Sequence, residues 1–224
     1  MSWKTLLGAA YNNNTIRRIF RLRPYVLQRE MRDCSTLLDL GCGPTSVIKF
    51  LQIPWSVGVE LHVPYIRETV KERIHNEYVL ADVRAVQFRE KCFDCVLASD
   101  VIEHLSKEEG YELIRKMKSI ARKKIIVTTT NGFIRSEAID GNPFQIHRSG
   151  WNVSELKGLG FKVWGLTGLK HIRERSKLPS HGDVLETVRF RPRPLWLLIA
   201  EATEILTWYM PEMSFELFCV KTMC

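Results

Sequence analysis

A carboxylate and two glycines stand together at the end of an apolar run, in the segment Thr-Leu-Leu-Asp-Leu-Gly-Cys-Gly at residues 36–43. The run up to Asp39 predicts a buried strand, and the apolar spacing of residues 47–51 predicts a helix after the glycine turn. Glycine accepts unusual backbone angles and lets a ligand approach the chain closely. Backbone N–H groups at such a turn, beside the start of a helix, bind polar or charged groups. The chemistry expected here is therefore ligand binding at a strand end.

Three more strand-like runs end in polar or acidic residues. Glu60 ends the second run, 21 residues after Asp39, and Asp82 follows the third. Ser99 and Asp100 follow the fourth. A carboxylate about 20 residues past a glycine turn can accept hydrogen bonds from both hydroxyls of a ribose. Any one of these acids alone is more simply explained as a residue that caps a turn or lies in solvent. Together, however, they lie outside the carboxyl ends of the strands, where an open α/β sheet binds its ligand.

Taken in order, these segments resemble the motifs of class I S-adenosylmethionine (SAM)-dependent methyltransferases. The matching segments are Asp39-Leu-Gly-Cys-Gly43, Glu60, Ala81-Asp82, Phe93-Asp94 and Asp100-Val-Ile-Glu-His-Leu105. The resemblance covers about residues 34–133. It implies a Rossmann-like α/β fold, with a seven-stranded, mostly parallel sheet and helices on both faces. In that fold the seventh strand usually lies antiparallel between the fifth and the sixth.

The resemblance also implies how the motifs bind SAM. Asp39 and the glycine turn would hold the amino-acid part, Glu60 the ribose and Asp82 the adenine amino group. Ser99 and Asp100 would lie beside the sulfonium. The complete expected cofactor-binding set is Asp39, Gly41, Cys42, Gly43, Glu60, Leu61, Asp82, Val83, Ser99 and Asp100. The turn departs from the family pattern in one respect, because Thr45 stands where a third glycine is often found.

Two other kinds of protein share parts of this pattern. A nicotinamide-cofactor dehydrogenase typically needs a third glycine for close helix packing, and position 46 is serine here. A catalytically silent, methyltransferase-like SAM-binding module is the second alternative. The intact glycine turn, together with Glu60 and Asp82, argues against it. The sequence therefore favours an enzyme that transfers the methyl group of SAM.

Two histidines are the candidate catalytic bases, because histidine titrates near neutrality and an oxygen acceptor must lose a proton. His104 follows Glu103 in the segment Asp100-Val-Ile-Glu-His104, after the fourth strand-like run. His147 lies in a polar, aromatic loop after the fifth, where this fold often faces the methyl acceptor. The same loop offers further candidates to line the acceptor pocket: Gln145, Arg148 and Trp151.

A metal-binding interpretation is also open for this part of the chain. Asp100, Glu103 and His104 would share one face of a helical turn and could hold a divalent metal. The motif resembles that of ubiquinone-pathway O-methyltransferases, in which the matching positions are implicated in metal binding. Many relatives without a metal share this Glu-His pair, whose side chains then satisfy backbone groups under the cofactor. We therefore expect no metal.

The chain divides into a basic N-terminal segment, residues 1–33, and a SAM-dependent methyltransferase domain, residues 34–224. The segment carries six arginines and an apolar stripe broken at Pro24, which predicts helices packed on the domain. A targeting peptide is the alternative for this segment. Residues 167–212 form a long insertion between the last two strands.

The insertion ends in an apolar helix predicted over residues 195–209. The stripe expected to pack in the core is Leu195, Leu198, Ile199, Ala202, Ile205, Leu206 and Tyr209. Trp196 and Trp208 fall off this stripe, and arginines stand before it at 189, 191 and 193. Exposed tryptophans beside arginines predict an association surface over residues 189–209, for an anionic membrane or a second copy of the chain. A second packing layer within the domain is the alternative.

Composition narrows the partners and the compartment. The formal net charge of +8 favours contact with phosphates, whether of nucleic acid, anionic lipid or an activated sugar. We expect O-methylation of a small-molecule, glycan or lipid-linked acceptor, and keep an RNA or tRNA methyltransferase as the alternative. N-methylases of exocyclic amines often carry Asn/Asp-Pro-Pro-Tyr/Phe after the fourth strand, where this chain has Ser99-Asp-Val-Ile. Six scattered cysteines predict reduced thiols and a cytoplasmic protein, with peripheral membrane binding open.

Overall fold

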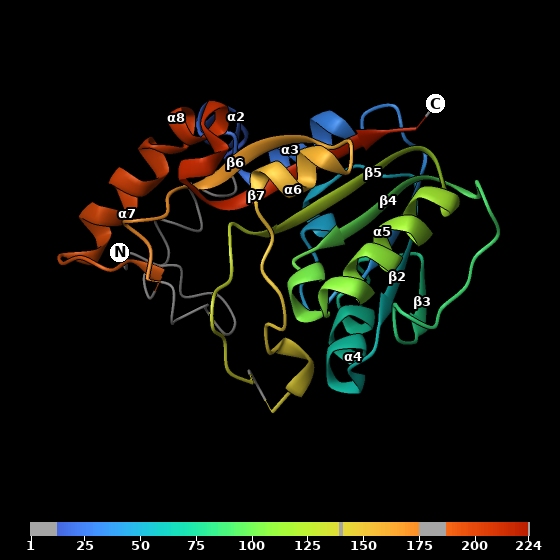
Figure 1. The fold of residues 1–224 in the computed structure, drawn as a ribbon. Helices are drawn as coiled ribbons and strands as arrows, with labels where there is room; N and C mark the ends of the chain where they lie inside the picture. The colour runs from blue at the N-terminus through green and yellow to red at the C-terminus, as the bar shows by residue number, and fades with distance from the viewer. Residues whose placement is uncertain (1–12, 139–140, 175–186, 224) are drawn as a thin grey trace.

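A seven-stranded sheet runs through the computed structural model, which describes residues 13–138, 141–174 and 187–223 (Figure 1). Its strands are β1 (Thr36–Leu40), β2 (Trp55–Glu60), β3 (Glu77–Leu80), β4 (Phe93–Ser99), β5 (Ala121–Thr130), β6 (Lys162–Leu169) and β7 (Ser214–Thr222). They lie in the order β3-β2-β1-β4-β5-β7-β6. β7 runs antiparallel to both of its neighbours, β5 and β6, and the other described strand pairs are parallel. The predicted fold is confirmed, including the antiparallel strand between the fifth and the sixth.

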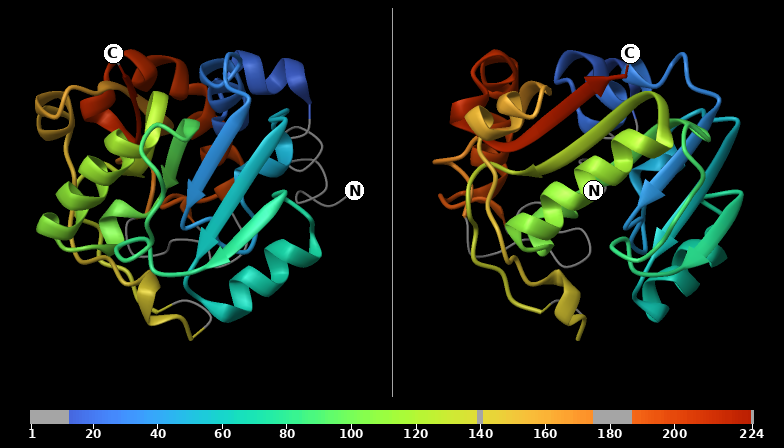
Figure 2. Two further views of the ribbon diagram at one scale, coloured as in Figure 1. Left: turned by 90° about the vertical axis from the view of Figure 1, so that its right-hand side faces the viewer. Right: turned by 45° about the vertical axis from the view of Figure 1, so that its right-hand side comes forward.

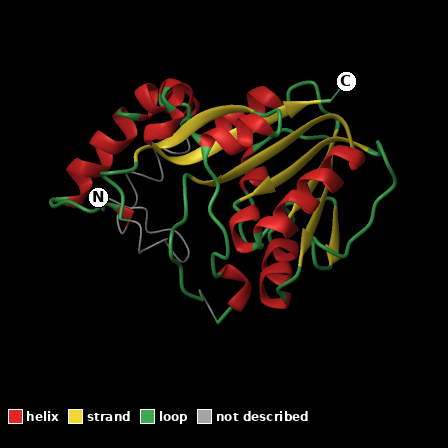
Figure 3. Cartoon of the chain, in the orientation of Figure 1, coloured by secondary structure: helices red, strands yellow, loops and turns green. Residues whose placement is uncertain are grey.

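Helices cover both faces of this sheet (Figures 2 and 3). They are α2 (Asn14–Ile19), α3 (Arg23–Glu30), α4 (Val63–Lys71), α5 (Lys107–Ile120), α6 (Val153–Gly158), α7 (Arg193–Ala202) and α8 (Glu204–Tyr209). One core contains Met117 of α5 and Leu156 of α6. A second core contains Leu27 of α3 and Trp208 of α8. The sheet is therefore the middle of three layers, and its parallel strands end together along one edge.

The basic N-terminal segment contributes to the second of these cores. Pro24 occupies the first turn of α3, where its missing N–H costs nothing. Val26, Leu27 and Met31 are fully buried. The described part of the segment thus packs on the sheet through α3, and the residues before 13 lie outside the described chain. The division of the chain at residue 33 stays a prediction.

The helix predicted after the glycine turn is reduced to a single 3-10 turn, η1 (Val47–Phe50). Ser46 caps this turn by accepting a hydrogen bond from the Ile48 N–H. β2 then begins at Trp55, directly after Pro54, and the residue before a proline is disfavoured in the α conformation. The connection is therefore too short and too constrained for a full helix.

The sequence also predicts a helix that starts at Pro64 and runs to about His75, but α4 is shorter and ends at Lys71. Arg73 takes a positive φ of 52°, which breaks the helical path. His75 then turns inward, where its Nδ1 lies 3.1 Å from Ser56 Oγ and its backbone N–H donates to Tyr78 Oη. Burial of His75 under the sheet thus ends the helix.

The prediction of one helix over residues 195–209 is wrong in two respects: the number of helices and the side that faces the core. Two helices, α7 and α8, meet at Thr203, whose hydroxyl donates to the Ala200 carbonyl and accepts from the Leu169 N–H. The predicted core stripe is largely exposed, with Leu198 54% and Tyr209 70% accessible. Trp208, predicted to be exposed, is buried. Within the described residues, no helix is long and apolar enough to cross a membrane.

Two glycines on β6 explain this facing. A Cβ at Gly165 would lie 2.3 Å from the Thr207 carbonyl oxygen, and a Cβ at Gly168 would lie 2.0 Å from that of Ala200. The helix backbones therefore rest directly on β6. Only the narrow face that carries Ala200, Thr203 and Thr207 fits such a close approach, so the large apolar side chains turn outward.

Candidate functional site

The glycine turn at the end of β1 has the conformation that its residues predict. Gly41 has φ +72° and Gly43 has φ +61°, a region that disfavours other residues. The backbone N–H groups of Gly41 and Cys42 both donate to the Val59 carbonyl, which ties the turn to β2. A Cβ at Gly43 would meet no atom within 4 Å. Open space beside a fixed backbone turn is what close approach of a ligand requires.

Glu60 lies at the end of β2 and faces this turn. One carboxylate oxygen accepts from the Gly43 N–H at 3.0 Å, and the other accepts from the His62 N–H at 2.7 Å. The residue is only 8% exposed. Each oxygen keeps a second lone pair, so the carboxylate can also accept from ribose hydroxyls. Glu60 therefore has two functions available to it, fixing the turn and holding a ribose.

We expect Glu60→Gln to weaken SAM binding by about 1.5–3 kcal/mol, because charge-assisted hydrogen bonds become neutral ones and an amide N–H₂ must face the donors. Calorimetric titration with SAM measures this directly. Glu68→Gln, on the surface of α4, is the matched control and should bind normally. Unchanged affinity in the Glu60 variant would contradict the assignment.

Asp39 and Cys42, two of the predicted cofactor residues, turn their side chains away from the ligand space. Asp39 is 1% exposed, accepts from Ser46 Oγ at 2.6 Å and lies 3.4 Å from His75 Nε2. Cys42 is also buried, and burial raises the pKa of its thiol. Asp39 therefore shapes the loop through Ser46, while Cys42 offers its backbone to the site.

Asp82 lies after β3 as predicted, but its carboxylate is already engaged. The Arg84 guanidinium donates to both of its oxygens, at 2.6–3.0 Å, and also reaches Glu109 of α5. Hydrogen bonding to Arg84 holds the pKa of Asp82 below its ordinary value. The neighbouring Val83 is buried. An adenine amino group would have to share Asp82 with Arg84, a partner that motif reasoning missed although it lies two positions away.

A second arginine reaches the site from the N-terminal segment. Arg23, at the start of α3, donates to Ser99 Oγ at 3.2 Å, to Asp100 and to Glu216 of β7 at 2.5 Å. Asp100 has φ +56°, which turns it toward this cation and toward Thr128 Oγ1 at 3.0 Å. One guanidinium thus balances two carboxylates at the strand ends. The sequence showed arginines in this segment but no signal for which one reaches the sheet.

The loop that carries His147 is fastened to the turn that carries His104. Backbone N–H groups of Arg148 and Ser149 both donate to the Glu103 carbonyl, at 2.8 and 3.0 Å. Ser149 Oγ and Trp151 Nε1 both donate to the Ile102 carbonyl. These four hydrogen bonds join the loop to η2 (Ile102–His104). They bring the His104 and His147 rings to 4.8 Å between centroids, edge to face.

Both imidazoles are held in the neutral form. Burial lowers the pKa of His104, and burial with the neighbouring His104 ring lowers the pKa of His147 to about 4. Within the described chain, Nδ1 of each ring is buried without a hydrogen-bond partner. Burial raises the pKa of Glu103 to about 8, so this carboxyl is protonated at neutral pH. The cluster therefore contains unprotonated nitrogens able to accept a proton.

The predicted grouping of Asp100, Glu103 and His104 is corrected by the structure. The group that comes together is Glu103, His104 and His147, with one ligand atom from each within 4.8 Å of the others. Asp100 pairs with Arg23 instead. Two imidazoles and a carboxylate could accept a divalent transition metal. The Glu103 carboxyl already accepts a hydrogen bond from Thr129 Oγ1 at 2.9 Å. This contact satisfies a buried hydroxyl and needs no metal.

Two of the three predicted pocket-lining residues of this loop lie elsewhere. Trp151 is completely buried in the core, and Lys107 Nζ lies 3.7 Å from the centroid of its ring. Arg148 is half exposed and pairs with Glu109 at 2.9 Å. Gly150 packs so closely that a Cβ would lie 2.3 Å from the Phe133 N. Trp151 is therefore an anchor of the loop, and Gln145 stays a candidate.

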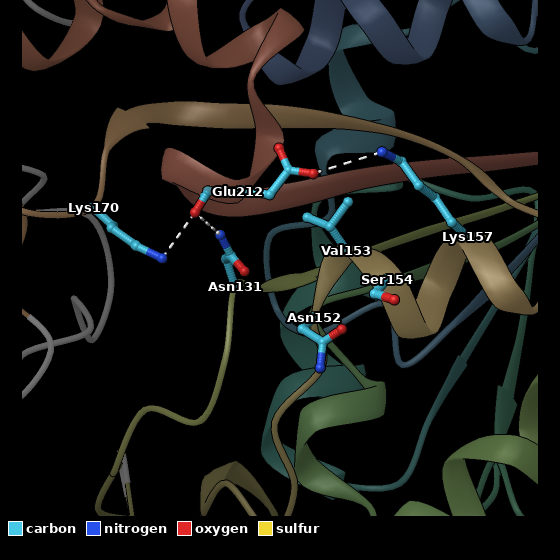
Figure 4. A pocket seen from close by; sticks show the side chains of 7 residues that line it. All are labelled: Asn131, Asn152, Val153, Ser154, Lys157, Lys170 and Glu212. Carbon is cyan, nitrogen blue, oxygen red and sulfur yellow. Dashed lines mark hydrogen bonds and ion pairs between the residues drawn. The ribbon is translucent and has the colours of Figure 1, made fainter.

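A cavity of about 530 Å³ opens at the base of this loop, on the side of β6 and β7 (Figure 4). Its lining residues are Asn131, Asn152, Val153, Ser154, Lys157, Lys170 and Glu212. Lys170 Nζ donates to the Glu212 carbonyl, and Lys157 lies 3.6 Å from the Glu212 carboxylate. None of the predicted cofactor or catalytic residues lines it. The cavity is thus separate from the glycine turn.

Comparison with known proteins agrees with this geometry. Residues 38–126 match the family model described as a methyltransferase domain. A SAM-dependent methyltransferase from Archaeoglobus fulgidus is 17% identical over 93% of this chain and 98% of its own, with a TM-score of 0.52. The plantazolicin methyltransferase BpumL, solved with SAH and a triazolic desmethylPZN analog, is 13% identical over 98% and 95%, with a TM-score of 0.55. The PH0226 protein from Pyrococcus horikoshii OT3 is 25% identical over 54% of this chain and 60% of its own, with a TM-score of 0.44. No curated protein matches the sequence.

The sheet order, the glycine turn and the carboxylate that faces it are those of the class I methyltransferase fold. Residues 38–126 are similar to the methyltransferase domain family, and this similarity supports a SAM-dependent methyltransferase with SAM as its cofactor. The residues present fit that cofactor, because the open space beside Gly43 lies next to a buried carboxylate with free lone pairs.

Proposed function

We propose that this enzyme methylates an oxygen atom of a small-molecule, glycan or lipid-linked acceptor in the cytoplasm. The observation that carries the proposal is the pair of imidazoles in edge-to-face contact beside η2, whose pKa values burial lowers and whose Nδ1 atoms have no hydrogen-bond partner among the described residues. An alcohol or phenol must lose its proton during methyl transfer, and a positioned imidazole is the side chain that most often removes it. An amine acceptor has less need of such a base.

His104 is the better placed of the two to receive that proton. It is partly exposed, whereas His147 is only 6% exposed. The backbone N–H of His147 donates to Ser136 Oγ at 2.7 Å, which keeps the second ring in place. SAM, when bound, supplies an electrophilic methyl group. The protein positions the acceptor and takes up its proton at His104, while His147 holds the first ring edge to face.

The loop also offers apolar surface to an acceptor. Phe133, Phe144 and Ile146 are exposed by 56%, 49% and 41%. Large apolar side chains gathered on a loop next to candidate catalytic residues are typical of binding sites, because loops carry function on a rigid scaffold. These three residues favour an acceptor with an apolar part. The cytoplasmic location is supported by the described cysteines, all of which are free.

An RNA acceptor is the second candidate, and the net charge of +8 is what favours it. The roles proposed for Asp82, Ser99 and Asp100 would be the same in either case, since they concern the cofactor. The acceptor class therefore has to be decided by assay.

A labelled-methyl screen with purified protein, SAM and pools of glycans, lipids, small phenols and RNA tests the proposal. We expect native mass spectrometry to show bound SAM or SAH, and label to enter an oxygen of a non-nucleic-acid acceptor. Label found only in RNA would overturn the proposed acceptor class. Bound SAM with no transfer to any pool would favour the silent module.

The same assay tests for a metal. We expect a chelator to leave turnover largely intact, because the unprotonated imidazoles can remove the proton without one. Turnover that is lost on chelation and restored by added magnesium or zinc would contradict this and assign Glu103, His104 and His147 to metal binding. The expectation is supported if the chelator-treated enzyme keeps its turnover and if adding magnesium or zinc does not change it.

A further inference from the structure

The α7–α8 unit has its polarity reversed relative to an ordinary surface helix. A helix on a water-soluble domain buries its apolar stripe and exposes its charges. Here the exposed positions follow one another at helical spacing along a face that carries no charge from Leu195 onward: Leu195, Leu198, Ala202, Ile205, Leu206 and Tyr209. The buried positions include Glu204 and Thr207. We call these six exposed residues of α7 and α8 the outer stripe.

The acidic groups of this unit do not reach the outer stripe. Glu201 accepts from the buried Arg173 at 2.7 Å, and Glu204 is 2% exposed. Burial raises the pKa of Glu204 well above its ordinary value. Glu201 and Glu204 are the only acids between residues 189 and 210. The charges left at the margin of the outer stripe are therefore positive.

Arginines stand at both ends of the outer stripe. Arg189 and Arg191 are exposed just before α7, and Arg193 begins it. At the other end Arg21 donates to Tyr209 Oη at 2.8 Å, and its guanidinium stacks 4.7 Å from that ring. This contact brings the C-terminal end of α2, with the exposed Ile19, beside α8 (Figure 1).

We propose that the outer stripe docks the enzyme on an anionic membrane surface, with its leucines, Ile205 and Tyr209 in the interface and the flanking arginines on lipid phosphates. Apolar side chains plus basic residues are the combination that interfacial helices use. The reversed polarity gives a reason for Gly165 and Gly168, which let the small-residue face pack inward. Charge complementarity favours lipid over a second copy, because two copies would bring like-charged arginines together.

Co-sedimentation with vesicles tests this docking without SAM or acceptor, so its failure would leave the proposed methyl transfer untouched. We expect pelleting with phosphatidylcholine–phosphatidylglycerol vesicles at low salt. Raising the salt, or omitting phosphatidylglycerol, should reduce binding by at least about tenfold, since each arginine near an anionic surface adds about a fivefold factor.

Variants locate the surface. Leu198→Glu with Leu206→Glu should reduce pelleting by at least about tenfold, and Arg189, Arg191 and Arg193 changed to Gln should do the same. Val70→Glu, at a 45% exposed apolar residue of α4, is the matched control and should pellet like wild type. Circular dichroism checks that each variant is folded.

Three results would overturn the proposal. One is the absence of pelleting at low salt, and another is equal binding to neutral vesicles. The third is a dimer, measured by light scattering, that Leu198→Glu with Leu206→Glu converts to monomer, because the outer stripe would then be an interface between copies.

Discussion

Gly43→Val is expected to abolish SAM binding while the sheet stays folded. The residue has φ +61°, where a β-branched side chain is strained by about 1–3 kcal/mol. The larger effect comes from volume. A Cβ at this position meets no protein atom within 4 Å, so the valine would stand in the open space beside the turn that faces Glu60. Its side chain would occupy the space that the cofactor needs.

Calorimetric titration with SAM measures this loss, and thermal denaturation checks the fold. Gly141→Val is the matched control, because Gly141 has φ +70° and a Cβ there would also meet no atom within 4 Å, but the residue lies in the loop after β5. It should carry similar strain and still bind SAM. Normal SAM affinity in folded Gly43→Val would mean that the cofactor does not lie against this turn.

His104→Asn is expected to lower kcat by about 10²–10⁴, the usual contribution of a general base, with the affinity for SAM unchanged. Because burial lowers the pKa of His104, the imidazole stays unprotonated below pH 6.5 and the wild-type enzyme should keep its activity there. The activity should fall only as the pH drops through that lowered pKa. In the variant this acidic limb should disappear from the residual rate.

The measurement is the pH profile of kcat with whichever acceptor the methyl screen identifies. His171→Asn, at an exposed histidine after β6, controls for loss of an imidazole and should behave like wild type. If His104→Asn retains full kcat and the same acidic limb, another group removes the proton. A raised KM with unchanged kcat would instead make His104 a residue that positions the acceptor.

The sheet could be predicted because its signals are local. Each strand is a short apolar run, and each run ends in glycine or a carboxylate, so the order of motifs along the chain was enough to place β1 to β4. The position of Glu60 at the end of β2 could be predicted in this way, whereas its hydrogen bond with the Gly43 N–H could not. The capping box at the start of α5 is local too, because Ser106 and Glu109 lie three residues apart.

What the sequence could not supply are contacts between distant segments. Arg23 meets Glu216 across almost the whole chain, and His75 reaches Asp39 under the sheet. Which face of α7–α8 turns inward is decided by two glycines on β6, which have no side chains to enter a hydropathy pattern. The periodicity correctly predicts one apolar stripe, but periodicity alone does not say on which side the protein lies.

The fastening of the His147 loop has a consequence for how this enzyme can diversify. The acceptors in its four hydrogen bonds to η2 are the main-chain carbonyls of Ile102 and Glu103, and two of the donors are main-chain N–H groups. Main-chain groups are the same whichever amino acid occupies the position. Residues such as Phe144 and Ile146 can therefore be replaced without loosening the loop. Acceptor preference can change over evolution while the two imidazoles keep their geometry.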